Sequence, residues 1–177
     1  FLTWNQKPIN TVYHATNGGV MASVDEAWSI DKVPYLQMRL DGPKHWSREV
    51  ELPLSNEKYL QSFLFAESEA YGSDHQLFRW NRTLLSSQIS KQLRQARKVN
   101  SSFFPKTIQA LSRGGSGRVT SLEIEGKNGS RISLKLDEIR RVLRQLPSTL
   151  FVVKEIKEGK WIFSGGGFGH GAGMSQS

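Results

Sequence analysis

The sequence predicts an α+β domain in which antiparallel hairpins and meanders pack against two to three helices. Three observations lead to this prediction. Short segments alternate between apolar and polar residues, turn-forming pairs such as Asn128-Gly129 separate them, and a few segments have apolar residues at helical spacing. Strands that are joined mainly by hairpins, with only a few helices between them, are typical of the α+β class.

The N-terminal part of the chain begins with a predicted hairpin. Residues 1–13 form two strand segments that turn at residues 5–7, and the run from 14 to 19 breaks the pattern as a loop. We expect one helical turn at residues 25–28. Residues 46–52 alternate between apolar and polar side chains, which predicts a further strand.

Two helices are expected in the middle of the chain. One begins after Ser55 and the other at Ser86, and serine is a favoured cap at the start of a helix. Residues 78–84 alternate as residues 46–52 do. A Trp-x-Arg strand followed by a serine-capped helix therefore occurs twice, which is a weak sign of an internal repeat and is called the echo below.

The segment from residue 108 onward gives clearer signals. The expected elements are, in order, a glycine-rich turn at 112–117, a strand pair joined by Asn128-Gly129, a helix over 137–146 that ends at Pro147, and a last hairpin over 150–164. That last hairpin leads the chain directly into a second glycine-rich run.

The composition restricts the kinds of partner and chemistry that are available. The chain has 177 residues, a net charge of +8 and no cysteine. The absence of cysteine excludes disulfides, thiol nucleophiles and cysteine-type zinc sites. The positive charge favours an anionic partner such as nucleic acid, lipid headgroups or an acidic wall polymer, or it reflects a solvated basic face. No apolar run approaches the ~20 residues of a membrane span.

The glycine-rich run at the C-terminus is the most informative feature of the chain. Six of the nine residues from Gly165 to Gly173 are glycine, and His170 lies between two of them. Glycine at this density weakens a core helix or strand. Such a run is useful where the backbone takes unusual φ values or approaches a ligand closely. The pattern therefore predicts a functional loop that presents a histidine.

Five segments together resemble the stage II sporulation protein D family, also called the amidase-enhancer or cell-wall lytic B family. They are the tail at 167–176, the loop at 13–19, Trp28 with Pro34-Tyr35-Leu36, the turn at 113–119, and the stretch at 148–151. The resemblance extends over nearly the whole chain in the family's order. It is weakest over 54–105, which we interpret as a family-variable insertion.

The resemblance implies a cell-wall protein that is part of a lytic transglycosylase, an enzyme that cleaves peptidoglycan glycan strands. In that family a glutamate acts as general acid and then as base, and it lies in a Glu-Met-Pro context upstream of the histidine loop. The present sequence has no Glu-Met-Pro. We therefore expect residues 1–177 to be the C-terminal part of a larger domain and to be inactive alone.

The resemblance also implies the site residues. His14, Thr16 and His170 are expected in the catalytic region. The residues expected to contact the substrate are Asn17, Gly18, Gly19, Trp28, Tyr35, Arg118, Phe168, Ser175 and Gln176. The alternatives are that the histidines only cap a turn or tie a loop to the core, and that the aromatic residues belong to the core.

Other chemistries receive less support. No metal or other cofactor is expected, because the histidines are far apart and the cysteines that complete a zinc site in some family members are absent. The acidic pair Asp25-Glu26 fits the charge preference of a helix N-terminus better than the role of a catalytic acid. His170 and Ser175 lack the third group of a nucleophilic triad.

The expected partners are peptidoglycan glycan strands and a cell-wall amidase, in the cell envelope outside the cytoplasm. The main alternative is a non-catalytic wall-binding module that stimulates an N-acetylmuramoyl-L-alanine amidase. A nucleic-acid partner is not expected, because only the charge and the Trp-x-Arg segments favour it and no helix-turn-helix or ribonucleoprotein motif is present.

Overall fold

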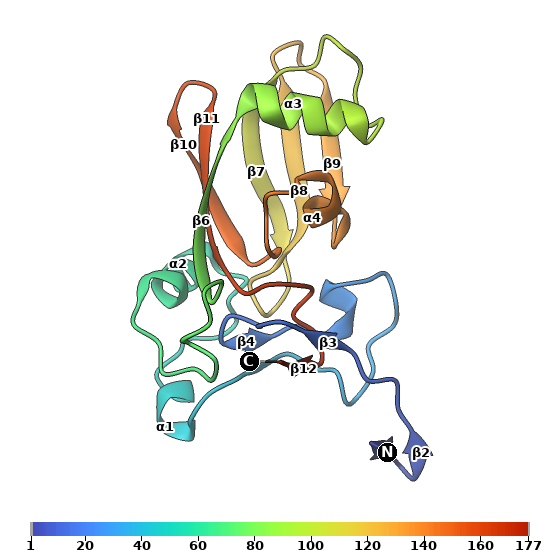
Figure 1. The fold of residues 1–177 in the computed structure, drawn as a ribbon, viewed down its shortest axis with the longest axis vertical. Coiled ribbons are helices and arrows are strands. Elements are labelled where there is room, and N and C mark those ends of the chain that lie inside the picture. The colour runs from blue at the N-terminus through green and yellow to red at the C-terminus, as the bar shows by residue number, and fades with distance from the viewer. Residues whose placement is uncertain (1, 177) are drawn as a thin grey trace.

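Two three-stranded antiparallel sheets dominate the structure, a computed structural model that describes residues 2–176. One sheet has the strand order β10-β11-β6 and the other β7-β8-β9. The strands are β6 (Arg79–Leu85), β7 (Pro105–Arg113), β8 (Val119–Gly126), β9 (Arg131–Lys135), β10 (Phe151–Lys157) and β11 (Lys160–Gly166). With the helices between them, these sheets confirm the predicted α+β class (Figure 1).

Four α-helices and one 3₁₀ helix accompany the sheets over residues 2–176. They are η1 (Val24–Glu26), α1 (Lys44–Ser47), α2 (Glu57–Phe65), α3 (Ser86–Gln95) and α4 (Glu138–Val142). Helix α3 runs across the strands of the β7-β8-β9 sheet, and α4 lies beside the same sheet (Figure 1). The expected helical turn at 25–28 corresponds to η1, one residue earlier.

The starts of the helices differ in detail from the prediction. The residue that caps α2 is Asn56, whose side-chain oxygen accepts hydrogen bonds from the next turn's amides, and not Ser55. Ser86 lies inside the first turn of α3 and is buried. Its hydroxyl accepts a hydrogen bond from the indole of Trp161 at 3.0 Å and donates one to the Pro105 carbonyl at 3.3 Å, so it joins the helix to both sheets.

Two of the predicted elements are wrong. Residues 46–52 are not a strand: Trp46 lies on α1 and its buried ring packs against Phe63 of α2. The apolar residue therefore serves a helix–helix contact, and the echo between 46–52 and 78–84 is not a structural repeat. The helix predicted over 137–146 ends at Val142, because Leu143 has ψ of 75° and leaves the helical region.

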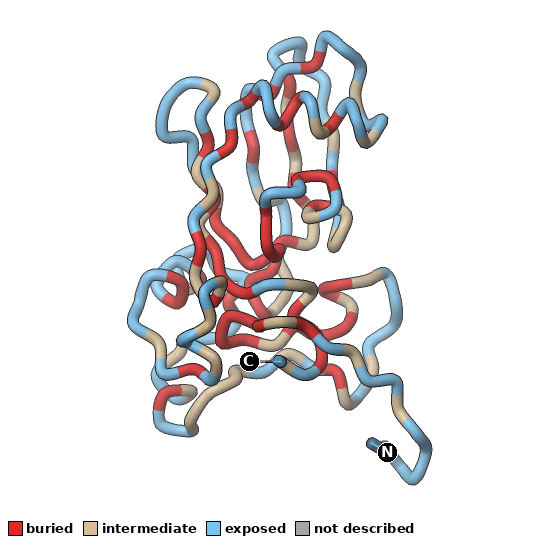
Figure 2. The backbone as a smooth tube through the Cα atoms, in the orientation of Figure 1, coloured by how far each residue is buried: buried red, intermediate tan, exposed pale blue. Residues whose placement is uncertain are grey.

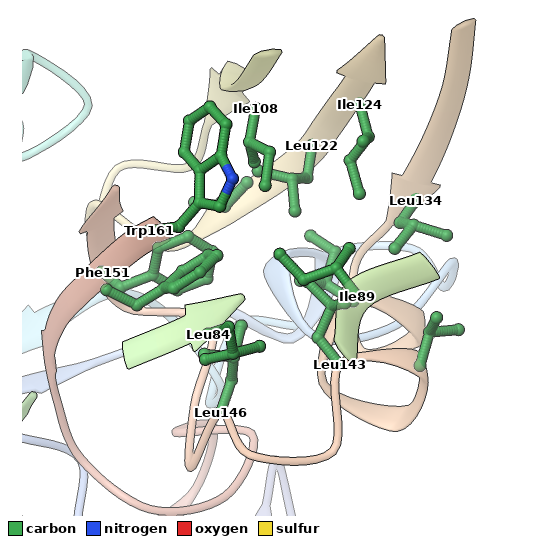
Figure 3. Packing of buried hydrophobic residues seen from close by; sticks show 14 of the residues in the cluster. Leu84, Ile89, Ile108, Leu122, Ile124, Leu134, Leu143, Leu146, Phe151 and Trp161 are labelled. Atoms are coloured by element: carbon green, nitrogen blue, oxygen red, sulfur yellow. The ribbon is translucent and has the colours of Figure 1, made fainter. Parts of the chain in front are cut away.

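The main hydrophobic core lies between the two large sheets and helices α3 and α4. Figure 3 shows Leu84 of β6, Ile89 of α3, Leu122 of β8 and Phe151 of β10 converging there. A second cluster surrounds α2 and includes Trp46. The segment 54–105 supplies α2, β6 and α3, and β6 pairs along its length with β11, so this segment is integral to both cores.

Three small strand pairs form the other end of the molecule. They are β1 (Thr3–Trp4) with β2 (Lys7–Pro8), β3 (Tyr13–His14) with β12 (Met174–Ser175), and β4 (Val20–Met21) with β5 (Arg39–Leu40). The β1–β2 hairpin turns at residues 5–6, within the predicted turn at 5–7. The predicted hairpin over 1–13 is shorter in the structure, because β2 ends at Pro8 and Tyr13 belongs to β3; Phe1 lies outside the described residues.

Both ends of the described chain lie at this end of the molecule (Figure 1). Figure 2 shows buried backbone where the small pairs meet the sheets and exposed backbone along the β1–β2 hairpin. Between residues 2 and 176, no helix has the length and apolar character needed to cross a membrane.

Candidate functional site

Two loops that are far apart in the sequence lie side by side. The parallel pairing of β3 with β12 places Tyr13 opposite Met174 and His14 opposite Ser175. An antiparallel bridge then joins Thr16 to Phe168, whose amide donates to the Thr16 carbonyl at 2.8 Å. The structure therefore brings together the His14 loop (residues 13–19) and the His170 loop (residues 165–176), whose histidines were both expected in the catalytic region.

The glycines of the His170 loop are required by its backbone. Four alternate residues, Gly167, Gly169, Gly171 and Gly173, have positive φ. At Gly171, where φ is +76°, an added Cβ would lie 2.0 Å from a guanidinium nitrogen of Arg118. Side chains are therefore excluded from the position where this loop crosses the rest of the site.

His14 is a buried, neutral imidazole. Its Nδ1 lies 3.0 Å from the Ala172 carbonyl oxygen, which can only accept, so Nδ1 carries the proton and donates. Burial lowers the pKa of His14 to about 4, because the charged ring would lose its hydration. The other nitrogen, Nε2, is then a hydrogen-bond acceptor, and it is buried with no partner among residues 2–176.

His170 lies between His14 and an aromatic side chain. Its ring centroid is 4.5 Å from that of Trp28 and 5.8 Å from that of His14, which it meets edge to face. Its Nδ1 accepts a hydrogen bond from the Ala172 amide at 3.2 Å. Burial lowers the pKa of His170, and a hydrogen bond with the Tyr13 backbone opposes this shift. Trp28, His170 and His14 therefore form a row of ring contacts, tilted by 48° and 78° and not parallel, which we call the stack.

The stack contains no carboxylic acid. Within the described chain, no carboxylate forms an ion pair or hydrogen bond with His14 or His170. No group of three histidine, cysteine, aspartate or glutamate side chains in that part of the chain has the arrangement of a metal site. Neutral imidazoles beside an indole can accept hydrogen bonds from hydroxyls and contact the face of a sugar ring.

The polar residues after His14 hold the loop in shape. Asn17 accepts from the Gly19 amide at 2.8 Å and donates to Asp41 at 2.5 Å, and the Thr16 hydroxyl accepts from the Gly18 amide at 3.3 Å. All four residues from Thr16 to Gly19 are buried. The structure thus gives loop-shaping contacts to Thr16, which the sequence predicted in the catalytic region, and to Asn17, Gly18 and Gly19, which it predicted to contact substrate.

Arg118 lies beneath the two loops and has no exposed surface. Its guanidinium donates to the Asn17 carbonyl at 2.9 Å and to the Val20 carbonyl at 3.0 Å. Burial lowers the pKa of Arg118 to about 10, and the negative charge of Glu26 opposes that shift. The prediction that Arg118 contacts substrate is therefore corrected: it positions the His14 loop from inside the protein.

The acidic partner of this arginine is a residue whose role the sequence analysis missed. Glu26 is buried and accepts hydrogen bonds from the Ser23 hydroxyl, the Ser116 amide and the Ser116 hydroxyl. A Cβ at Gly114 would lie 2.3 Å from the Glu26 carboxyl carbon. The glycine-rich turn at 114–117 was the available signal, because such a turn permits close approach of another group.

The remaining predicted residues fall into two places. Phe168 is exposed on the His170 loop, Ser175 contacts the Ala15 carbonyl at 3.4 Å, and the Gln176 amide donates to the His14 carbonyl at 3.0 Å. Tyr35 lies outside the stack and pairs with Trp4, with ring centroids 6.3 Å apart. The two rings line a separate hollow of about 400 Å³.

Comparison with known protein families assigns the chain to one family. The model of a family described as a domain of unknown function (DUF8618) matches residues 22–173, and the chain therefore belongs to that family. The matched range includes Trp28, Glu26, Arg118 and the His170 loop up to Gly173, and it begins after the His14 loop. A search of curated proteins finds no match.

Proposed function

For this member of the DUF8618 family, we propose that the His14 and His170 loops bind glycan strands of bacterial peptidoglycan. The chain would act in cell-wall remodelling, in the cell envelope, as part of a lytic transglycosylase of the stage II sporulation protein D type. The single observation that carries the proposal is the interlocking of the two signature loops around the stack of Trp28, His170 and His14.

The chemistry of the stack suits an uncharged sugar. The pKa of His14 is about 4, so the ring is neutral at neutral pH and its Nε2 is a hydrogen-bond acceptor. Nε2 is buried and has no hydrogen-bond partner among the described residues. This nitrogen is buried, since His14 is only 4% exposed, so a glycan would contact the exposed ring faces beside it and not the nitrogen itself. The half-exposed rings of Trp28 and His170 and the exposed ring of Phe168 offer apolar faces beside it.

Cleavage of a glycosidic bond requires a proton donor at the leaving oxygen. No carboxylate in the described part of the chain contacts either imidazole, and the one buried carboxylate nearby, Glu26, is engaged by Ser23 and Ser116. We therefore propose that the acid is a glutamate on sequence that precedes residue 1 in the whole protein, and that His14 and His170 orient the substrate.

The same observation favours a second candidate. A site with acceptors and aromatic faces but no acid in residues 2–176 also fits a wall-binding module without chemistry of its own. Such a module would bring an N-acetylmuramoyl-L-alanine amidase to its substrate. The two candidates share the ligand and differ only in whether bonds are cleaved.

Binding is tested by sedimentation of the protein with purified peptidoglycan sacculi. We expect Phe168→Ser to weaken retention about three- to tenfold, because an exposed aromatic contact is lost. The control is Phe65→Ser, which removes an exposed ring from α2; Phe65 is 66% exposed and Phe168 is 42% exposed. His170→Ala is compared in the same way with His45→Ala, whose imidazole pairs with Glu69. Retention that is equal in all four variants would refute the assignment.

The two candidates are separated by the soluble products. Full-length protein incubated with sacculi should release anhydro-muropeptides if the chain belongs to a lytic transglycosylase. Release of stem peptides only when an amidase is added would favour the enhancer function. Residues 1–177 should bind sacculi without releasing either product, and any glycan cleavage by them would contradict the proposed position of the acid.

A further inference from the structure

A hollow of about 390 Å³ beside the His170 loop is lined by four arginines. Arg82 comes from β6, Arg140 and Arg141 from α4, and Arg144 from the segment that follows α4. Phe168 of the His170 loop completes one side. No aspartate or glutamate lines the hollow, so its surface carries a concentrated positive charge.

Little of this charge is neutralised within the protein. Asp137 pairs with Arg140 at 3.0 Å and lies 3.9 Å from Arg141, so one carboxylate serves two guanidinium groups. Over residues 2–176, neither Arg82 nor Arg144 has a carboxylate within ion-pair distance. Like charges grouped in this way repel one another, and an anion placed between them removes that repulsion.

The hollow is continuous with the loops described above. Phe168 lines it, and the Phe168 backbone exchanges hydrogen bonds with Thr16. Pro147, which also lines it, accepts a hydrogen bond from the Gly169 amide at 3.1 Å. Burial lowers the pKa of His170; among the charges of this region Asp137 opposes the shift and Arg140 adds to it, so the hollow and the stack are close enough to interact electrostatically.

We infer that this hollow binds anionic oxygens carried by the same polymer whose sugar rings contact Phe168 and His170. Planar guanidinium groups recognise carboxylate and phosphate oxygens with paired hydrogen bonds. In a wall polymer such groups are the carboxylates of peptide stems or the phosphodiesters of attached anionic chains. This inference deepens the proposed function and rests on it for the identity of the polymer, but the anion site itself can be measured alone.

The first measurement uses poly-L-glutamate as a probe that carries carboxylates and no sugar. Arg82→Gln combined with Arg144→Gln should weaken its binding about tenfold at low salt, since each exposed ion pair is worth a few-fold. The matched control combines Lys157→Gln with Lys160→Gln. These exposed lysines face each other across the β10–β11 pair, so the control substitutions remove the same amount of charge at another place on the surface. If both double variants lose the same affinity for poly-L-glutamate, the inference is overturned.

The second measurement uses sacculi with and without their covalently attached anionic chains. If Arg82→Gln with Arg144→Gln reduces retention on stripped sacculi, the stem carboxylates are the ligand. If the reduction in retention appears only on unstripped sacculi, the phosphodiesters are the ligand. No reduction on either would refute the inference even if wild-type protein binds sacculi.

The two proposals can fail separately. Wild-type protein that binds poly-L-glutamate through these arginines but ignores sacculi would leave the anion site intact and refute the proposed function. Retention of a single-stranded oligonucleotide at physiological salt that is lost in the same double variant would overturn the inference in favour of nucleic-acid recognition.

Discussion

Substitution of Gly171 by alanine tests whether the contact between the His170 loop and Arg118 holds the site together. Gly171 has φ of +76°, and a Cβ there would lie 2.0 Å from Nη2 and 2.3 Å from Cζ of Arg118. The guanidinium cannot move freely, because it is fully buried and donates to the Asn17 and Val20 carbonyls. The added methyl group must therefore displace a hydrogen-bonded charge.

Two contributions determine the size of the effect. A non-glycine residue with left-handed φ costs about 1–2 kcal/mol. A hydrogen bond to a charged group is worth about 1.5–3 kcal/mol, and the clash removes at least the one from Arg118 to the Asn17 carbonyl. Gly171→Ala should therefore lower the free energy of unfolding by about 3–5 kcal/mol, a large part of the ~5–15 kcal/mol that such a domain has.

The chain offers a control that isolates the second contribution. Gly129, in the turn between β8 and β9, has φ of +80°, and no atom lies within 4 Å of an added Cβ. Gly129→Ala should thus lose only about 1–2 kcal/mol. Urea titration followed by tryptophan fluorescence measures both variants. If Gly171→Ala is no less stable than Gly129→Ala, the loop does not press against Arg118 and the reasoning is refuted.

Three further predictions concern the groups beneath and within the loops. Arg118→Met should destabilise the fold by about 3 kcal/mol, because two buried carbonyls lose their donor and the Glu26 carboxylate loses the nearby positive charge. A decrease in the free energy of unfolding of less than about 1 kcal/mol, measured by urea titration, would contradict this. Ser116→Ala should cost about 1–3 kcal/mol by removing a donor from buried Glu26, and Ser130→Ala in an exposed turn serves as its control. The pKa of the His14 imidazole is near 6.5 in the unfolded state and about 4 in the folded state. Between these pH values the unfolded state binds more protons, so the free energy of unfolding decreases as the pH falls from 6.5 to 4, by at most about 3 kcal/mol. His14→Gln should flatten that pH dependence, and an identical slope in the variant would show that His14 does not cause it.

The sequence predicted the fold best where local signals and long-range packing agree. The Asn128-Gly129 turn and the hairpin formed by β10 and β11 were predicted correctly, because turn residues and alternation are local properties. Residues 46–52 were misassigned because their apolar–polar alternation fits a strand, whereas Trp46 lies on a short helix and packs on Phe63. The choice between them depended on a partner that lies elsewhere in the chain.

The candidate site was predicted in part for a similar reason. Glycine spacing and histidines identified both loops, and the structure places them together. For the charged residues, the motif at 113–119 identified Arg118, but nothing in the sequence indicated that it is buried or that Glu26 lies near it. Arginine and glutamate are usually surface residues. Only the fold buries Arg118 and Glu26, which are more than ninety residues apart in the chain, close enough to interact electrostatically and to share contacts with Ser116. Burial of charge is a property of the pairing and cannot be read from either residue alone.

The backbone of a single residue of the His170 loop determines which ring nitrogen carries the proton in both imidazoles. Ala172 lies between Gly171 and Gly173, and its carbonyl accepts from His14 Nδ1 while its amide donates to His170 Nδ1. His14 is therefore protonated at Nδ1, and His170, when neutral, at Nε2. In a catalytic triad a carboxylate orients the histidine and stabilises its charged form. Here an uncharged backbone orients both rings and burial favours their neutral forms, which suits recognition of sugar hydroxyls better than proton transfer and is the physical reason to seek the acid outside these loops.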